Sequence, residues 1–123
     1  MKCLFCEISN KNIESLVLYE DDLIMIILDA FPDCDGHTLI IPKNHYETFK
    51  DIPDDLLKHI YKYAKIYTDI LLEKLNKKAL TLAINYGDAQ VIKHFHLHLL
   101  PDYKSKAVMD RKKVYEIITG ENL

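Results

Sequence analysis

Residues 93–100 read Lys93-His94-Phe95-His96-Leu97-His98-Leu99-Leu100, an apolar stretch with a histidine at every second position. Alternate side chains of a β-strand point to opposite faces, so the three histidines share one face and lie about 6–7 Å apart. The phenylalanine and leucines between them share the other face, which we expect to be buried. Because imidazole can donate, accept, ligate a metal or attack as a nucleophile near neutral pH, the histidine face indicates a functional site.

The composition is typical of a small globular domain. The chain has 123 residues, of which 49% are hydrophobic and 28% charged. This length and composition predict one domain over residues 1–123. The longest apolar run, residues 23–28, is far shorter than a membrane span, and residues 1–7 lack the long apolar segment of a secretory signal. We therefore expect a cytoplasmic protein that does not associate with membranes.

Charge and cysteine content exclude two further classes. The net charge is −3, and the 16 basic residues are scattered along the chain. They form no broad basic face, so we expect no nucleic-acid partner. The chain has three cysteines, an odd number that argues against a disulfide framework.

Hydrophobic periodicity predicts the remaining elements. Besides the histidine stretch, we expect short strands at residues 17–20, 23–28, 37–41 and 80–86. Apolar residues recur at three- or four-residue steps over residues 56–75, after a proline and two aspartates, which predicts an amphipathic helix of about six turns. A short helix is expected over residues 110–119, ending at Gly120. The predicted fold class is α+β: an antiparallel sheet of about five strands with one long helix packed across it and a short C-terminal helix.

Several motifs together resemble the histidine triad (HIT) family. Its signature, His-x-His-x-His followed by two apolar residues, matches residues 94–100, and residues 36–42 and 85–90 match neighbouring family motifs. Residues 3–8 and 28–45 look like the Hint-type branch of the family. The resemblance runs from about residue 3 to residue 103 in the expected order. It implies a HIT-like fold and hydrolysis of purine nucleoside phosphoramidates or dinucleoside polyphosphates.

The histidines also suit this chemistry on physical grounds. An imidazole nitrogen can attack phosphorus and hold the nucleotide covalently until water releases it. The step needs a neutral imidazole whose second nitrogen is a fixed donor, and further donors for the phosphate oxygens. The resemblance implies that His96 is the nucleophile, with His98 and His37 beside the phosphate. Gln90 and Asn85 are then the amide partners of the phosphate and the ribose.

The resemblance also predicts a site for a purine nucleotide. Asp29 follows a buried strand, and a carboxylate can accept hydrogen bonds from both ribose hydroxyls, as an aspartate does at the matching family position. Phe5, Ile8 and Ile27 match apolar positions that sandwich the base. Two alternatives stay open: Asp29 could cap the loop after its strand, and the three apolar residues could simply pack in the core.

The cysteines near the N-terminus point to a metal. Cys3 and Cys6 look like half of a tetrahedral zinc site, and the other two ligands in zinc-bearing relatives match His45 and His94. A site closed by four protein ligands would be structural. The resemblance therefore implies a structural Zn²⁺ that fixes the N-terminus to the sheet, and no metal requirement for the chemical step.

Other functions and the assembly state remain to be tested. The chain could be a nucleotide-binding interaction protein with incidental turnover, or a nucleotidyl transferase, although transferases of this superfamily alter the position of His98. A hydrolase with a catalytic metal on the triad is also possible, with Asp102 as the only nearby acidic ligand in sequence. Asp102 also departs from the family pattern, because many HIT relatives carry a basic residue at the matching position.

The resemblance implies a homodimer formed through the long helix and adjacent strands.

Overall fold

The computed structural model describes residues 3–121. Over these residues the chain order is α1 (Leu4–Ser9), β1 (Val17–Glu20), β2 (Ile24–Leu28), β3 (Thr38–Pro42), η1 (Phe49–Asp51), α2 (Asp54–Leu75), β4 (Leu80–Ala83), η2 (Gly87–Ala89), β5 (Leu97–Pro101) and α3 (Arg111–Thr119). None of the helices in this part of the chain has both the length and the apolar composition needed to cross a membrane.

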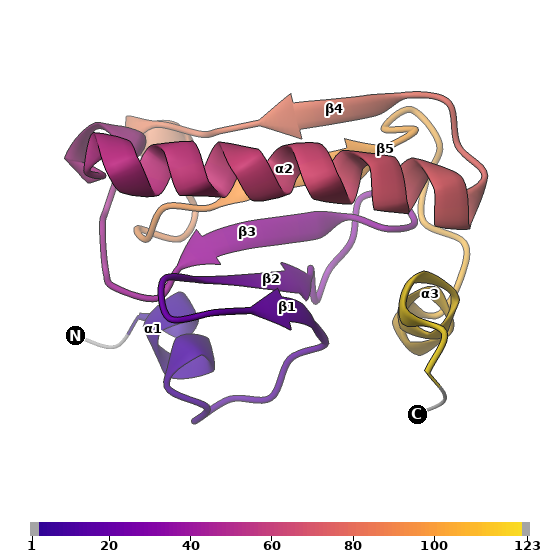
Figure 1. Cartoon of the computed structure of the whole chain (residues 1–123), viewed down its shortest axis with the longest axis horizontal. Coiled ribbons are helices and arrows are strands. Elements are labelled where there is room, and N and C mark those ends of the chain that lie inside the picture. The colour runs from indigo at the N-terminus through magenta and orange to yellow at the C-terminus, as the bar shows by residue number, and fades with distance from the viewer. Residues whose placement is uncertain (1–2, 122–123) are drawn as a thin grey trace.

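The five strands form one antiparallel sheet in the order β1-β2-β3-β5-β4. The first three strands are a meander, because short connections favour antiparallel neighbours. The chain then crosses the sheet as α2, forms the edge strand β4 and returns as β5 between β3 and β4 (Figure 1). This topology confirms the predicted sheet and places the end of the histidine stretch inside it.

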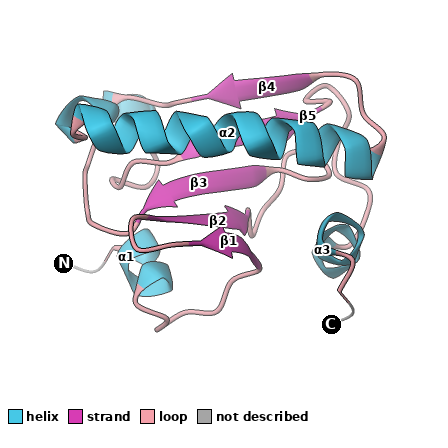
Figure 2. Cartoon of the chain, in the orientation of Figure 1, coloured by secondary structure: helices cyan, strands magenta, loops and turns pink. Residues whose placement is uncertain are grey.

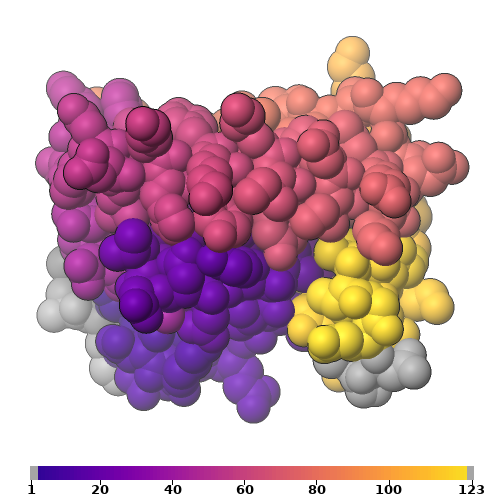
Figure 3. Space-filling view, in the orientation of Figure 1, coloured from indigo at the N-terminus to yellow at the C-terminus, as the bar shows by residue number. Residues whose placement is uncertain are grey.

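The main core lies between α2 and one face of the sheet, where the long helix lies over the sheet with its axis roughly along the strands (Figure 2). Its buried members include Leu56, Ile60, Ala64, Leu71 and Leu75 of α2, Ile24, Ile26, Leu97 and Leu99 of the sheet, and Phe95 two residues before β5. Each fully buried Leu, Ile or Phe contributes roughly 1.5–3 kcal/mol, so this interface dominates the stability. Viewed from this side, α2 forms the upper half of the molecular surface, with the N-terminal part of the chain and the smaller α3 below it (Figure 3).

The opposite face of the sheet carries a smaller apolar cluster. Phe5 and Ile8 of α1 pack there against Met25, Ile27, Leu39 and Ile41. Strands β2 and β3 are therefore buried on both faces, with successive side chains directed to α2 and to α1 in turn. The short helix α1 was not predicted from the sequence, because six residues carry too little periodicity to reveal a helix.

Two predicted strands are shorter in the structure. Strand β5 begins only at Leu97, so His94 and His96 precede the regular ladder. The Phe95 N–H bonds the Tyr46 carbonyl (2.7 Å), because β3 has already ended at Pro42 and cannot supply a partner there. Strand β4 stops at Ala83, not at residue 86, because its register with β5 runs out near the start of that strand.

The loop between β2 and β3 is packed against the C-terminal part of the chain. Asp35 is buried, and its Oδ1 accepts hydrogen bonds from the backbone N–H groups of Val108 and Met109 (3.0 Å each). Gly36 has φ +86°, and a Cβ there would lie 2.4 Å from Leu75 Cδ1. The loop thus joins the C-terminal end of α2 to the segment before α3. Helix α3 ends before Gly120, as predicted.

Candidate active site

A row of imidazoles, those of His94, His96, His98 and His37, lies on the α1 side of the sheet. Phe95, Leu97 and Leu99 belong to the core under α2, so the alternating histidines face the other way, as predicted. The His96 and His98 ring centroids are 4.8 Å apart. His37, directly before β3, extends the row with its ring centroid 5.1 Å from that of His98.

The hydrogen bond of His96 defines its tautomer. His96 Nδ1 lies 2.8 Å from the His94 carbonyl oxygen, which can only accept, so Nδ1 carries the proton and Nε2 keeps its lone pair. Burial lowers the pKa of His96, although the bond to His94 and the charge of Asp29 act in the opposite direction. The ring is therefore neutral at pH 7. A neutral imidazole with a fixed, unprotonated Nε2 is what a nucleophile at phosphorus requires.

A chain of hydrogen bonds defines the tautomers of the next two rings. The Asp33 N–H donates to His37 Nδ1 (3.1 Å), so His37 carries its proton on Nε2. That nitrogen lies 2.9 Å from His98 Nδ1 and donates to it. His98 must then be protonated on Nε2, a buried atom with no hydrogen-bond partner among the described residues. The row thus holds an unpartnered donor next to His96.

Burial also keeps these two rings neutral. It lowers the pKa of His98 to about 4, with further lowering by His96 and His37. It likewise lowers the pKa of His37, against the opposing charges of Asp29 and Asp33. The Nε2–H of His98 is accordingly a neutral donor at physiological pH.

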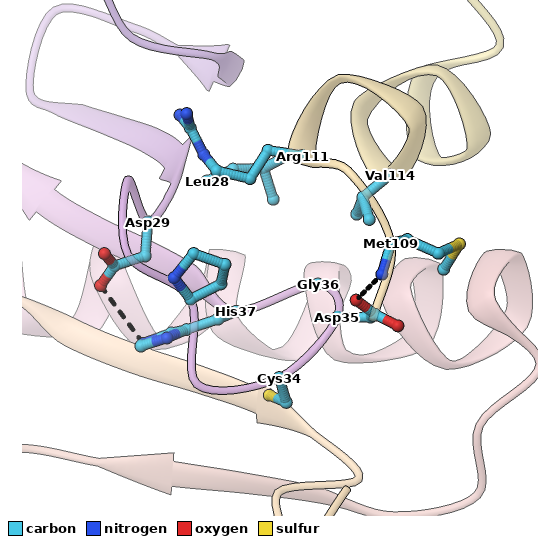
Figure 4. Close-up of a pocket in the computed structure, with 10 residues that line it drawn as sticks. Leu28, Asp29, Cys34, Asp35, Gly36, His37, Met109, Arg111 and Val114 are labelled. Carbon is cyan, nitrogen blue, oxygen red and sulfur yellow. Dashed lines mark hydrogen bonds and ion pairs between the residues drawn. The ribbon is translucent and has the colours of Figure 1, made fainter. Parts of the chain in front are cut away.

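Asp29 stands at the end of this row. Its Oδ1 accepts from the Phe31 N–H (2.8 Å), and its Oδ2 lies 3.5 Å from His37 Nε2. The carboxylate therefore caps its loop, as one alternative held, and also faces the histidines. Figure 4 shows Asp29 and His37 at one side of a small pocket, with Met109, Arg111 and Val114 on the other.

A second cluster lies at the other end of the row. It consists of Cys3, Cys6, His45 and His94, whose ligand atoms all lie within 4.8 Å of one another. His94 Nδ1 is 3.3 Å from Cys3 Sγ and 3.5 Å from Cys6 Sγ, and His45 Nδ1 is 3.3 Å from Cys6 Sγ. Helix α1 supplies Cys6, while Cys3 caps its N-terminus. The structure thus brings together all four predicted metal ligands.

The donor set of this cluster fits zinc. Zn–S distances of about 2.3 Å and Zn–N distances of about 2.0 Å in a tetrahedron place neighbouring ligand atoms roughly 3.3–3.8 Å apart. The three measured separations agree with those values. His94 Nε2 lies 2.9 Å from the Pro42 carbonyl oxygen and so carries the proton, which leaves Nδ1 to ligate a metal.

The two predicted amide residues lie in different environments. Gln90 is buried, and its Nε2 donates to the Glu47 carbonyl oxygen (2.7 Å), while its Oε1 has no partner among the described residues. Asn85 follows β4 and is exposed. Gln90 therefore holds the segment before the histidines against the loop that precedes η1. Among the described residues, neither amide makes a hydrogen bond to one of these histidines.

The three residues predicted to hold the base lie together on the α1 side of the sheet. Phe5, Ile8 and Ile27 all belong to the small apolar cluster there and are buried. The Phe5 ring meets the His96 ring edge-on at a centroid distance of 5.0 Å. The cluster therefore borders the imidazole row, and its members also pack against one another, as the alternative prediction held.

The fold and the histidine row agree with a comparison of the sequence to known families. A family model described as the HIT domain matches residues 10–105. The chain belongs to the HIT family. The matched region contains the whole imidazole row and Asp29, whereas Cys3 and Cys6 lie outside it.

Individual relatives of this HIT protein support the assignment. It is 38% identical over 104 residues to an uncharacterized HIT-like protein of Methanocaldococcus jannaschii, with 83% of this chain and 80% of the relative covered. It is 36% identical over 101 residues to adenylylsulfatase HINT3 of Arabidopsis thaliana, covering 80% of this chain and 51% of that protein. A crystal structure of a zinc-bound histidine triad family protein from Mycobacterium smegmatis matches with a TM-score of 0.89 at 30% identity, covering 98% of this chain and 92% of that chain.

Several main-chain groups of the HIT site could not be predicted from the sequence. The carbonyls of His94 and Pro42 and the N–H of Asp33 set the tautomers of three histidines. Every residue carries such groups, so no residue type reveals which of them will face a ring. The glycine at position 36, where the chain turns directly before His37, was the only nearby signal.

Proposed function

We propose that this HIT protein is a nucleotidyl hydrolase that cleaves purine nucleoside phosphoramidates or dinucleoside polyphosphates through a nucleotide bound covalently to His96. The observation that carries the proposal is the bond from His96 Nδ1 to the His94 carbonyl, which leaves Nε2 unprotonated beside the unpartnered donor of His98. A relative named as an adenylylsulfatase supports a nucleotide substrate.

The reaction follows from these tautomers. The Nε2 lone pair of His96 forms a bond to phosphorus, and the bond to the leaving group breaks with its electron pair. Positive charge on the ring is stabilised through Nδ1–H by the His94 carbonyl, and the Nε2–H of His98 donates to a phosphate oxygen. The leaving group takes up a proton from solvent as it departs. Water then attacks phosphorus and releases a proton to solvent, and the electron pair of the N–P bond returns to Nε2. The products are a nucleoside monophosphate and the free leaving group.

The nucleotide would lie along the row, with its ribose on the carboxylate of Asp29. That carboxylate keeps acceptor capacity besides the bond to Phe31. The base would lie against the apolar cluster of Phe5, Ile8 and Ile27. The exposed amide of Asn85 and the second N–H of Gln90 would then face the ribose and the phosphate.

We further propose a structural Zn²⁺ on Cys3, Cys6, His45 and His94. The ligand separations and the tautomer of His94 support it, as does the zinc-bound relative. The four side chains would fill all coordination positions of a bound ion and leave none open for a substrate. The contribution of the ion would therefore be to fasten α1 to the sheet.

A homodimer through α2 and β4 is the assembly that we propose. These elements leave Tyr61, Ile66 and Leu82 each at least 40% exposed. Strand β4 is also an edge of the sheet, with backbone groups on its outer side that a second strand could pair. Both features favour burial against a second copy.

Denaturing mass spectrometry after rapid mixing with an adenosine phosphoramidate tests the proposed function. We expect an adenylyl adduct that maps to His96 and decays as adenosine monophosphate forms. His96→Ala should lose both the adduct and turnover, because no other row member has an unprotonated Nε2. His59→Ala, a histidine of α2 outside the row, is the matched control and should retain both. Normal turnover by His96→Ala would refute the mechanism.

A further inference from the structure

Phe31 presents its ring to solvent from an ordered loop. Its side chain is 88% exposed, whereas Phe5 and Phe95 are 3% and 1% exposed. The loop is held by hydrogen bonds from the Phe31 N–H to Asp29 Oδ1 (2.8 Å) and from the His37 N–H to the Cys34 carbonyl (3.1 Å). The ring is thus displayed by a defined turn and not by a loose segment.

This turn also carries the groups that would bind a nucleoside. Phe31 is two residues from Asp29, so their Cα atoms are at most about 7 Å apart. The Asp29 carboxylate itself bonds the Phe31 backbone, and its other oxygen faces His37. A nucleoside whose ribose is bound by Asp29 therefore has its base within reach of the Phe31 ring.

The base needs a second apolar surface at this site. Phe5, Ile8 and Ile27 are 3%, 7% and 2% exposed, so they can line one face of a purine but cannot cover the face that points to solvent. The Phe31 side chain, by contrast, is largely exposed. Aromatic rings stack on bases without reading their hydrogen-bonding edges.

We infer that Phe31 is a specificity-determining residue that stacks on the purine base from the solvent side while Asp29 holds the ribose. The inference rests on the proposed function and names the residue that covers the solvent-facing side of its base. Stacking is stronger on large flat bases, so loss of the Phe31 ring should weaken binding of a purine nucleotide more than that of a pyrimidine nucleotide.

A single tryptophan reports on this contact directly. The chain has no tryptophan, so Phe31→Trp introduces the only one. We expect adenosine monophosphate to quench its fluorescence in a saturable manner and ribose 5-phosphate to leave it unchanged. Leu23→Trp is the control: position 23 is 49% exposed and lies before β2, at the opposite end of that strand from Asp29. Its fluorescence should not respond to either ligand.

Steady-state kinetics give a second readout. Phe31→Ala should raise KM for an adenosine phosphoramidate about tenfold, within the range expected for loss of one stacked base, with kcat little changed. Phe31→Tyr should keep the wild-type KM, because tyrosine retains an aromatic ring that can stack on the base. The same Phe31→Ala change should affect a cytidine phosphoramidate less.

Two results would overturn the inference, and calorimetry with the wild-type protein separates them. If adenosine monophosphate binds the wild type but neither quenches Phe31→Trp nor binds more weakly to Phe31→Ala, then stacking on Phe31 is refuted while the nucleotide site stands. If the wild type binds no nucleotide at all, the proposed function fails and the inference fails with it.

Discussion

At the scale of single residues, His94 connects the two clusters of the molecule. Its Nδ1 faces the sulfur atoms of Cys3 and Cys6, while its backbone carbonyl accepts a hydrogen bond from His96 Nδ1–H. Burial lowers the pKa of its ring to about 4, so the ring is neutral. A displacement of this one residue would disturb both the proposed zinc ligands and the tautomer of the proposed nucleophile, His96.

Gly36 is the residue whose replacement we expect to cost most stability in the loop before β3. Gly36→Ala should lower the free energy of unfolding by about 2–4 kcal/mol, because φ +86° strains an alanine and its Cβ would meet Leu75 Cδ1 at 2.4 Å. Gly87→Ala is the matched control, since φ is +66° there but no atom lies within 4 Å of the added Cβ. It should cost only about 1 kcal/mol. Equal losses in urea denaturation would contradict the steric argument.

At the scale of elements, a polar network fastens the β1–β2 turn to α2. Asp21 Oδ2 accepts from Tyr19 Oη (2.9 Å) and from His59 Nε2 (2.7 Å), while Oδ1 accepts the N–H groups of Leu23 and Ile24. Burial acts to raise the pKa of Asp21, but these bonds outweigh it and lower the pKa to about 2. The turn and the helix are thereby joined through one carboxylate.

This network makes stability depend on pH. The pKa of Asp21 is about 2 in the folded protein against an ordinary 3.8, so its stabilisation is present above pH 4 and is lost as the pH falls toward 2. Asp21→Asn should reduce the free energy of unfolding by about 1–2 kcal/mol at pH 6, a value lowered to allow for the partial exposure of the carboxylate. The difference in free energy between wild type and variant should narrow toward pH 2. Urea denaturation at several pH values measures it. Asp22→Asn, at the exposed neighbouring position, should show no such trend; a gap independent of pH would argue against this role of Asp21.

We expect helix α1 to depend on the proposed zinc site, because the helix is short and packs mainly through Phe5 and Ile8. Removal of zinc by a chelator should lower the melting temperature and increase amide hydrogen exchange over residues 4–9. Cys6→Ser should reproduce both effects and reduce the bound zinc measured by atomic emission. Cys34→Ser is the control, because that cysteine lies outside the cluster and its variant should retain the metal. Unchanged exchange in α1 after zinc loss would count against a structural metal.

At the scale of the whole molecule, α2 covers the core, and its outer side together with β4 is the face that we propose for the dimer. Leu82→Lys should convert the proposed dimer to a monomer, because it places a charge among the apolar groups that a partner would bury. Sedimentation equilibrium measures the change. Val108→Lys is the control: position 108 is 85% exposed but belongs to the segment before α3. A wild-type chain that sediments as a monomer would remove the assembly proposal.

The sequence by itself determined the fold class and the face on which the histidines lie. Strand periodicity placed the three histidines on one face and Phe95, Leu97 and Leu99 on the other, because side chains alternate in any extended segment. The spacing of apolar residues likewise predicted α2. These features are local, and local patterns survive folding unchanged.

Only the tertiary structure decided the chemistry of each ring. Which nitrogen of His96 or His98 carries a proton depends on the His94 carbonyl and on the Asp33 N–H acting through His37. The exposure of Phe31 also depends on how its loop packs. Backbone groups are the same at every residue, so their partners, and with them the tautomers, are set by how distant segments meet in space.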